Sequence, residues 1–156
     1  MKKKLLPVAA YLDKVRVPMR IGCTTESSWP VVLSLWFTHR DGKLYCATQE
    51  SARVVSYLRA NPKCAFEIAA DTPPYCGVRG QALASVDKTL GPEILEELIY
   101  RYLGEKENPL ARKLLDKLET EVAIILKPVN YFSWDYSSRM QKIAPSMLEL
   151  AEKSCP

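Results

Sequence analysis

The chain has 156 residues, of which 47% are hydrophobic and 26% are charged, a balance typical of one globular domain with a proper core. The formal net charge of +4 is modest and its only dense basic run, Lys2 to Lys4, indicates a solvated tail, so a nucleic-acid-binding protein is not indicated. No apolar segment approaches the roughly 20 residues that span a bilayer, and the N-terminus lacks the apolar stretch of a secretory signal, so we expect a cytoplasmic protein without a membrane partner.

The numbers and positions of cysteine and histidine limit the kinds of metal site and catalytic site that the chain can build. The five cysteines are an odd number without a C-x-x-C pair, which predicts reduced, packed thiols. The single histidine, His39, lies beside a probable turn. A histidine-based metal site or a Ser-His-Asp triad therefore has almost nothing to be built from, and we predict no metal. The cysteines are Cys23, Cys46, Cys64, Cys76 and Cys155.

The first half of the chain reads as β-rich. Residues 7–15 predict a short helix and residues 19–24 a first strand. In PVVLSLWFTHRDGKLYCAT two β-rich runs flank Asp41-Gly42, the pair that a type I′ turn needs because both central positions have positive φ, so a β-hairpin is predicted. The first run has one apolar face and one mixed face that could meet a ligand or a partner chain. The apolar face carries Val31, Leu33, Leu35 and Phe37.

The second half alternates strands and helices. Strands are predicted at 64–70, 77–86, 122–126 and 129–136. Helices are predicted from Gly91-Pro92 to a Gly104 cap, from Asn108-Pro109, and in a tail. We expect a single domain over 1–156, with a helical insertion at about 91–119 and a C-terminal helical tail at about 140–156. The absence of GxGxxG, GxxxxGK[ST] and GxSxG motifs argues against a Rossmann fold or a P-loop.

The segment LYCATQESARVVSYLRANPKC, residues 44–64, predicts a strand that leads into a helix through polar residues. Arg53 stands at the start of this helix, where the macrodipole favours acidic side chains, a mismatch of about 0.3–1 kcal/mol if nothing compensates for it. One interpretation is that Ser51 caps the helix while Arg53 pairs with Glu50 or lies in solvent.

Four groups of residues occur in an order that resembles the pyridoxamine 5′-phosphate oxidase-like family, split β-barrels that bind FMN or a deazaflavin coenzyme. The resemblance covers roughly residues 19–139. It implies a mainly β protein with peripheral helices (α+β), a six- to seven-stranded antiparallel split barrel, and a homodimer with the cofactor at the subunit interface. The four groups are Leu35-Trp36-Phe37 with Asp41 to Tyr45, Ser51-Ala52-Arg53 with Tyr57 to Pro62, Pro73 to Gly80, and Trp134-Asp135-Tyr136.

The resemblance implies a phosphate site at the start of the helix after the hairpin. Ser51 and Arg53 match the family's phosphate-holding cluster, with Thr48 nearby as a hydroxyl donor. A bound phosphate would take hydrogen bonds from free backbone N–H groups and a charge-assisted contact from Arg53, which resolves the mismatch. Ala52 stands where many members carry a second basic residue, and Glu50 adds repulsion. The alternatives are therefore weak phosphate binding, binding that uses Arg59 or Arg79 from elsewhere, and loss of the phosphate site.

The resemblance also implies which residues surround the flavin ring. The backbone of Ser34, Leu35 and Trp36 would contact the polar edge of the ring, or Trp36 would simply pack at a dimer interface. Tyr75 and Arg79 match a segment beside the ring, and Trp134 and Arg139 match residues that reach the cofactor from the other subunit. The alternative is that these four are ordinary loop, strand and surface residues. The arginine and histidine cluster that recognises pyridoxal phosphate has no counterpart after Trp134, so pyridoxamine phosphate oxidase activity itself is not expected.

The expected function is that of an FMN-binding oxidoreductase that passes electrons or a hydride to a small acceptor. No catalytic residue is predicted, because the cofactor would carry the redox chemistry. One alternative is a deazaflavin-dependent reductase, whose coenzyme has an acidic tail that Arg16, Arg20 and Lys2 to Lys4 could meet. The other alternative is a non-catalytic split barrel that binds flavin or haem, or that has lost its cofactor.

Overall fold

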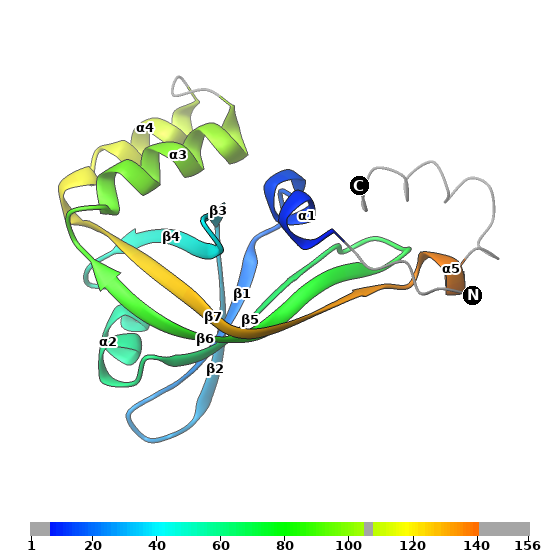
Figure 1. The fold of residues 1–156 in the computed structure, drawn as a ribbon. Coiled ribbons are helices and arrows are strands. Elements are labelled where there is room, and N and C mark those ends of the chain that lie inside the picture. Colours follow the sequence, from blue (N-terminus) through cyan, green and yellow to red (C-terminus); the bar gives the residue numbers. More distant parts are fainter. Residues whose placement is uncertain (1–6, 105–107, 141–156) are drawn as a thin grey trace.

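A computed structural model describes residues 7–104 and 108–140 of the chain. In this part, seven antiparallel strands form one sheet in the order β2-β1-β5-β6-β7-β4-β3 (Figure 1). The strands are β1 (Met19–Thr24), β2 (Pro30–Leu35), β3 (Thr38–Arg40), β4 (Lys43–Gln49), β5 (Lys63–Ala69), β6 (Cys76–Asp87) and β7 (Glu121–Asp135).

The predicted hairpin is shorter than expected. Asp41 and Gly42 have φ angles of 49° and 73°, as the predicted turn requires, but only the three residues of β3 pair with β4. The run before the turn is broken at Trp36 and Phe37, and β2 pairs with β1 instead. Phe37 explains the break, because its side chain is fully buried and its N–H donates to the hydroxyl of Tyr102 rather than to a strand.

The two predicted strands at 122–126 and 129–136 are one strand, β7, of 15 residues. The two predicted strands left out Lys127 and Pro128, and proline has no N–H to give to a ladder. The register between β6 and β7 shifts between Gln81 and Ala82, so Pro128 is accommodated at an irregularity without ending the strand. The predictions at 19–24, 64–70 and 77–86 are confirmed by β1, β5 and β6.

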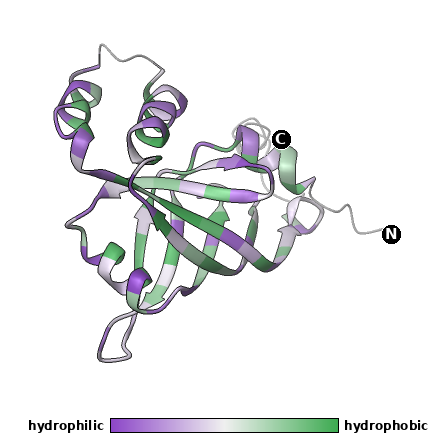
Figure 2. Cartoon of the chain, turned by 60° about the vertical axis from the view of Figure 1, so that its left-hand side comes forward, coloured by the Kyte–Doolittle hydropathy of each residue, from purple (hydrophilic) through white to green (hydrophobic). Residues whose placement is uncertain are grey.

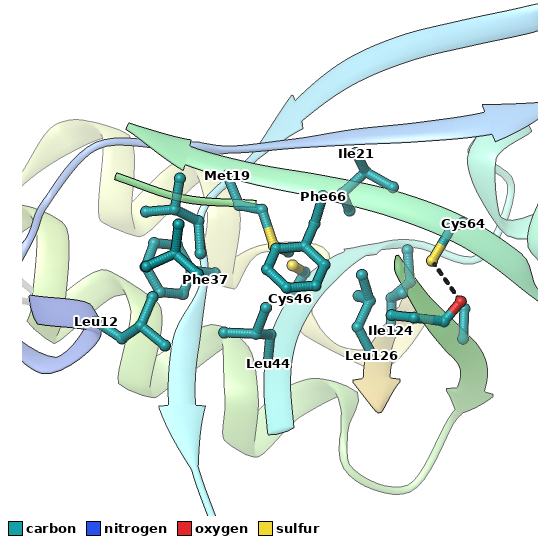
Figure 3. Close-up of a cluster of buried hydrophobic side chains, with 14 of the residues drawn as sticks. Leu12, Met19, Ile21, Phe37, Leu44, Cys46, Cys64, Phe66, Ile124 and Leu126 are labelled. Carbon is teal, nitrogen blue, oxygen red and sulfur yellow. Dashed lines mark hydrogen bonds between the residues drawn. The ribbon is translucent and has the colours of Figure 1, made fainter. Parts of the chain in front are cut away.

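The core lies inside the curled sheet, where buried side chains from facing strands meet (Figure 3). Val31, Leu33 and Leu35 are half-buried against this core and Phe37 is fully buried, so the apolar face predicted for the first run closes the barrel. Fully burying such a side chain contributes about 1.5–3 kcal/mol. The centre of the core is formed by Met19, Ile21, Leu44, Phe66, Ile124 and Leu126.

Four of the cysteines, Cys23, Cys46, Cys64 and Cys76, are core residues. Cys23, Cys46 and Cys64 are free and buried, as predicted, and burial raises the pKa of the Cys64 thiol to about 11. Cys76 is disulfide-bonded, which corrects the expectation of a reduced thiol there. Its burial inside β6 fits the expectation of packing but did not reveal its oxidation state.

The helices lie around the barrel. They are α1 (Val8–Lys14), α2 (Arg53–Ala60), α3 (Gly91–Leu103), α4 (Pro109–Leu115), the 3₁₀ turn η1 (Leu118–Thr120) and α5 (Ser137–Met140). Figures 1 and 2 show α3 and α4 side by side outside the barrel, with their hydrophilic residues away from it. Ile94 and Leu98 of α3 pack on Ala123 of β7. The helical tail predicted at 140–156 lies outside the described residues, apart from Met140.

Within the described residues, none of the helices combines the length and apolar character that crossing a bilayer requires.

Candidate functional site

The barrel is open along one seam, between β2 and the second half of β4. Within the described chain β2 pairs only with β1, and β4 pairs with β3 only through Lys43 to Tyr45, so no ladder joins β2 to Ala47–Gln49. A cavity of about 380 Å³ opens at this seam beneath α3 and α4, and we call it the seam pocket. Its lining is Ser34, Leu35, Trp36, Ala47, Thr48, Gln49, Leu95, Leu98, Leu110, Leu114 and Glu121.

Four of the predicted site residues meet in this pocket. Ser34, Leu35 and Trp36 line it from the β2 side and Thr48 from β4. The Trp36 ring is also packed within the chain, since it stacks on Tyr102 with the ring centroids 4.9 Å apart and the planes 4° from parallel. The structure thus holds Trp36 in place without any partner chain.

The start of α2 has no side-chain cap. The N-cap residue is Ala52, and Ser51 does not cap the helix, so the capping interpretation of Ser51 is wrong. Glu50 instead accepts from Arg59 and Lys88, each at 3.1 Å, and these hydrogen bonds, that from Arg59 first, lower the pKa of its carboxyl. Arg53 is exposed and has no ionic partner among the described residues, so of the two alternatives given for it, a pair with Glu50 or a place in solvent, it has the second.

These contacts determine which charged side chains near the start of α2 are paired. Glu50 is compensated by two cations, which reduces the repulsion that sequence reasoning expected from it. Arg59 is one of these two cations, so it is already paired. Arg53 lies four and five positions beyond the pocket-lining Gln49 and Thr48, and it has no ionic partner in the part of the chain that the structure describes.

The remaining predicted residues form a second group at the other end of the long β6–β7 pair, away from α3 and α4 and close to α5 (Figure 1). The Arg79 guanidinium lies 5.5 Å from the ring centroids of both Phe132 and Trp134, and Arg139 lies 5.3 Å from the ring centroid of Tyr136. Within one chain, the structure does not bring this group to the seam pocket. Tyr75 is 43% exposed, and its carbonyl accepts from the N–H of Tyr136.

Arg79 also lines a larger groove of about 630 Å³ on the outer face of the sheet. Strands β2, β1, β5, β6 and β7 all contribute to this outer groove. Its apolar wall is well exposed, because Val32, Tyr131 and Phe132 have 70%, 60% and 50% of their surface accessible. Val32 and Ser34 are two residues apart on β2, so the outer groove and the seam pocket both open along the same side of this strand.

Sequence reasoning missed two polar residues of the seam pocket, Gln49 and Glu121. They are direct partners across the β4–β7 ladder, and Gln49 Nε2 donates to Glu121 Oε1. Glu121 is only 4% exposed, and desolvation by burial raises the pKa of its carboxyl, an effect that the Gln49 hydrogen bond opposes. The available signal was a glutamate directly before the apolar strand run Val122 to Leu126, but its partner is visible only once the register is known.

Comparison with known proteins found no matching family model and no matching curated protein. Solved structures do match. A conserved hypothetical protein from Mycobacterium tuberculosis superposes with a TM-score of 0.71 at 16% identity, covering 92% of this chain and 94% of that one. An F420 reductase gives 0.68 at 17% identity, covering 81% and 96%. A Listeria innocua protein named for pyridoxamine 5′-phosphate oxidase gives 0.61 at 18% identity, covering 80% and 93%.

The chain has the split-barrel fold of the pyridoxamine 5′-phosphate oxidase-like proteins. This confirms the mainly β architecture with peripheral helices, and the seam between β2 and β4 is where the barrel splits. At sequence identities below 20%, the likeness to these structures shows the fold alone. Activity and ligand have to be argued from the residues of the site itself.

Proposed function

We propose that this protein is an FMN-binding oxidoreductase that works as a homodimer and passes electrons or a hydride to a small acceptor. The observation that carries the proposal is the combination of an uncapped helix start, an exposed Arg53 without an ionic partner among the described residues, and an apolar pocket at the barrel seam that Thr48 and Gln49, shortly before this helix, help to line. Bound FMN would supply the redox chemistry, and the chain would hold and shield it.

The residues present fit the phosphate of FMN. The first backbone N–H groups of α2 have no side-chain acceptor in the described chain, and anions bind favourably at such helix ends. Arg53 would add a charge-assisted hydrogen bond, and the hydroxyls of Ser51 and Thr48 are near in sequence. Because Glu50 is paired with Arg59 and Lys88, its charge opposes a phosphate less than an isolated carboxylate would.

The seam pocket fits a flat aromatic ring. Its walls are largely aliphatic, from Leu35 on β2 and the leucines of α3 and α4, and the ring of Trp36 is held by its stack on Tyr102. The edge of β2 that faces away from β1 has no strand partner among the described residues. Those backbone groups of Ser34 to Trp36 that point away from β1 are therefore free to bind the polar edge of a ring.

A second copy of the chain would complete the site. The exposed apolar wall of the outer groove adjoins β2 and suits a dimer contact. Trp134, near the end of β7, and Arg139, on α5, do not line the seam pocket of their own chain, so their expected role at the cofactor would require that they come from the partner. Tyr75 and Arg79 belong to the same group.

A deazaflavin coenzyme is the second candidate, favoured by the match to an F420 reductase. Of the cations considered for its acidic tail, Arg16 is already used, since it donates to the carbonyls of Asp13, Lys14 and Arg101. Arg20 lines the outer groove together with Arg79, although it pairs with Asp71 at 2.8 Å. Equilibrium dialysis with each coenzyme separates the two candidates by which one is retained.

The phosphate site is tested by titrating flavin-free protein with FMN and with riboflavin, which lacks the phosphate. We expect Arg53→Ala to weaken FMN binding by about 10- to 100-fold, the range of a hydrogen bond to a charged group, and to leave riboflavin binding unchanged. Lys63→Ala, which removes an exposed cation just beyond the other end of α2, is the matched control. Equal FMN binding by the wild type and Arg53→Ala would show that the helix start does not hold the phosphate.

A further inference from the structure

A further cavity lies beside α1, between this helix, the β3–β4 hairpin and strands β5, β6 and β7. Its volume is about 260 Å³, and we call it the α1 pocket. Its walls include Val8 and Leu12 of α1, Leu44 of β4, Phe66 of β5 and Val78 of β6, and none of its lining residues lines the seam pocket. Leu12, Leu44 and Phe66 are among the core side chains in Figure 3. An apolar cavity of about 150 Å³ is already large enough to hold benzene.

His39 reaches this pocket from β3. Its direct partner across the β3–β4 ladder is Leu44, which is 1% exposed in the barrel core. Direct partners of an antiparallel pair have their side chains on the same face, so His39 points to the inner face of the hairpin. Only 16% of its side chain is accessible. His39 and Tyr131 carry the polar side-chain atoms of a lining that is otherwise apolar.

Asp13 of α1 determines which nitrogen of the His39 ring carries the proton. Its Oδ1 atom lies 3.1 Å from His39 Nδ1, and because an ionised carboxylate can only accept, Nδ1–H is the donor. In the neutral ring Nε2 then has a free lone pair. In the described chain no hydrogen bond reaches Nε2, and the fully buried side-chain atoms without a partner are on Glu97, Arg101 and Glu121. Nε2 is therefore an acceptor that keeps accessible surface.

We propose that the α1 pocket binds a small, largely apolar molecule with one hydroxyl group, of the size of a simple phenol, and that His39 Nε2 accepts the hydrogen bond of that hydroxyl. The apolar walls select an apolar body, and the single histidine acceptor selects a molecule with an O–H donor. Asp13 is a positioning residue, because it holds the ring proton on Nδ1. The proposal does not rest on the proposed cofactor, since the two pockets share no lining residue.

The test uses two probes that differ in one group, para-cresol and its methyl ether, which has no O–H to donate. His39 is the single histidine of the chain, so nitrogen NMR of protein with isotope-labelled histidine reports this ring alone. The full chain is titrated with each probe at a pH at which the spectrum shows a neutral ring. We expect the proton on Nδ1, a shift of the Nε2 resonance when para-cresol is added, and no such shift with the methyl ether.

Two variants separate a binding role of His39 from a merely structural one, with affinities measured by titration calorimetry. His39→Asn offers an amide N–H to Asp13 in place of Nδ1–H but has no counterpart of Nε2. We expect it to bind para-cresol about three- to tenfold more weakly, the range of one hydrogen bond, and to bind the methyl ether as the wild type does. Asp41→Asn is the matched control, because Asp41 is an exposed turn residue of the same hairpin and asparagine tolerates its positive φ.

Several outcomes overturn the proposal. A neutral ring with its proton on Nε2, or an Nε2 resonance that para-cresol does not shift, removes the acceptor on which the proposal depends. Unchanged para-cresol affinity in His39→Asn shows that the Asp13–His39 contact only joins α1 to the hairpin. If His39→Asn binds neither probe, the pocket itself has changed, and the NMR titration of the wild type decides the matter. Retention of FMN changes none of these outcomes, because the cofactor is proposed for the seam pocket.

Discussion

Gly91, the first residue of α3, lies directly against the backbone of Glu121, the first residue of β7. A Cβ atom on Gly91 would be 2.1 Å from the Glu121 carbonyl oxygen and 2.7 Å from Val122 Cα. The absence of that side chain lets α3 begin directly against the backbone of β7, and Leu95 and Leu98, further along α3, line the seam pocket together with Glu121.

Substituting Gly91 with alanine should therefore destabilise the fold, because the clash is with backbone atoms that cannot turn aside. We expect Gly91→Ala to lower the free energy of unfolding by about 1–3 kcal/mol in urea denaturation, the usual cost of overpacking. Gly22→Ala is the control, since a Cβ there meets only Ala65 Cβ at an ordinary 3.8 Å. Equal stability of the two variants would contradict the tight packing of α3 on β7.

The Arg101 side chain of α3 joins α1 to the barrel through hydrogen bonds and a ring contact. Its guanidinium donates to the carbonyls of Leu12, Asp13 and Val15 at 2.6–2.9 Å and lies 5.3 Å from the Phe37 ring centroid. Arg101→Met removes these three hydrogen bonds, and although Arg16 still donates to the Asp13 and Val15 carbonyls, the Leu12 carbonyl loses its side-chain donor, so we expect a loss of about 1–3 kcal/mol in unfolding free energy. Arg20→Met, which removes an exposed ion pair with Asp71, should cost less than about 1 kcal/mol. If Arg101→Met lowers the free energy of unfolding no more than Arg20→Met does, the Arg101 hydrogen bonds do not stabilise the fold.

Glu121 should make stability depend on pH in a defined direction. Burial raises its pKa in the folded state above the unfolded value, so between the two the native state binds more protons. Its contribution is therefore fully present below the unfolded pKa and is lost as pH rises through the folded pKa. We expect Glu121→Gln to be stabilised relative to the wild type as pH rises across this window, measured by urea denaturation at successive pH values. A stability difference that does not change with pH would mean that Glu121 titrates normally.

The homodimer can be tested at Val32, which is 70% exposed in the outer groove. If the groove meets a second copy, Val32→Arg places a charge in that apolar contact, and light scattering should report a shift from dimer to monomer. Tyr100→Arg is the matched control, because Tyr100 is 74% exposed on α3, outside the groove. A wild-type protein that is monomeric by light scattering would rule out both the dimer and the shared site.

Much of the fold was predictable because its signals are local. The type I′ turn at Asp41-Gly42 and the helix that starts at Asn108-Pro109 follow from the preferences of single residues, and Asn108 does accept from the Leu110 N–H as an N-cap. The break at Trp36-Phe37 was not predictable, because the run is uniformly β-rich. Phe37 leaves the ladder to enter a core whose other members come from distant strands.

The candidate site was predictable only in part for the same reason. Ser34, Leu35, Trp36 and Thr48 do line one pocket, yet the resemblance gave no indication that Glu50 is paired with Arg59 and Lys88. Those partners come from the far end of α2 and from the turn after β6, so they depend on tertiary packing. Glu121 was missed because its hydrogen bond comes from a cross-strand partner, Gln49, and its backbone packs against the first residue of α3, and both contacts depend on the tertiary fold.

The most direct test of the central claim is the visible absorption spectrum of the protein as purified from flavin-producing cells, before and after FMN is added and the excess removed. The account predicts retained flavin bands, released as FMN on denaturation and bleached by a reduced nicotinamide or another donor. A spectrum that stays featureless after FMN is added would contradict the account and would mean that Arg53 is a surface charge at an empty helix start.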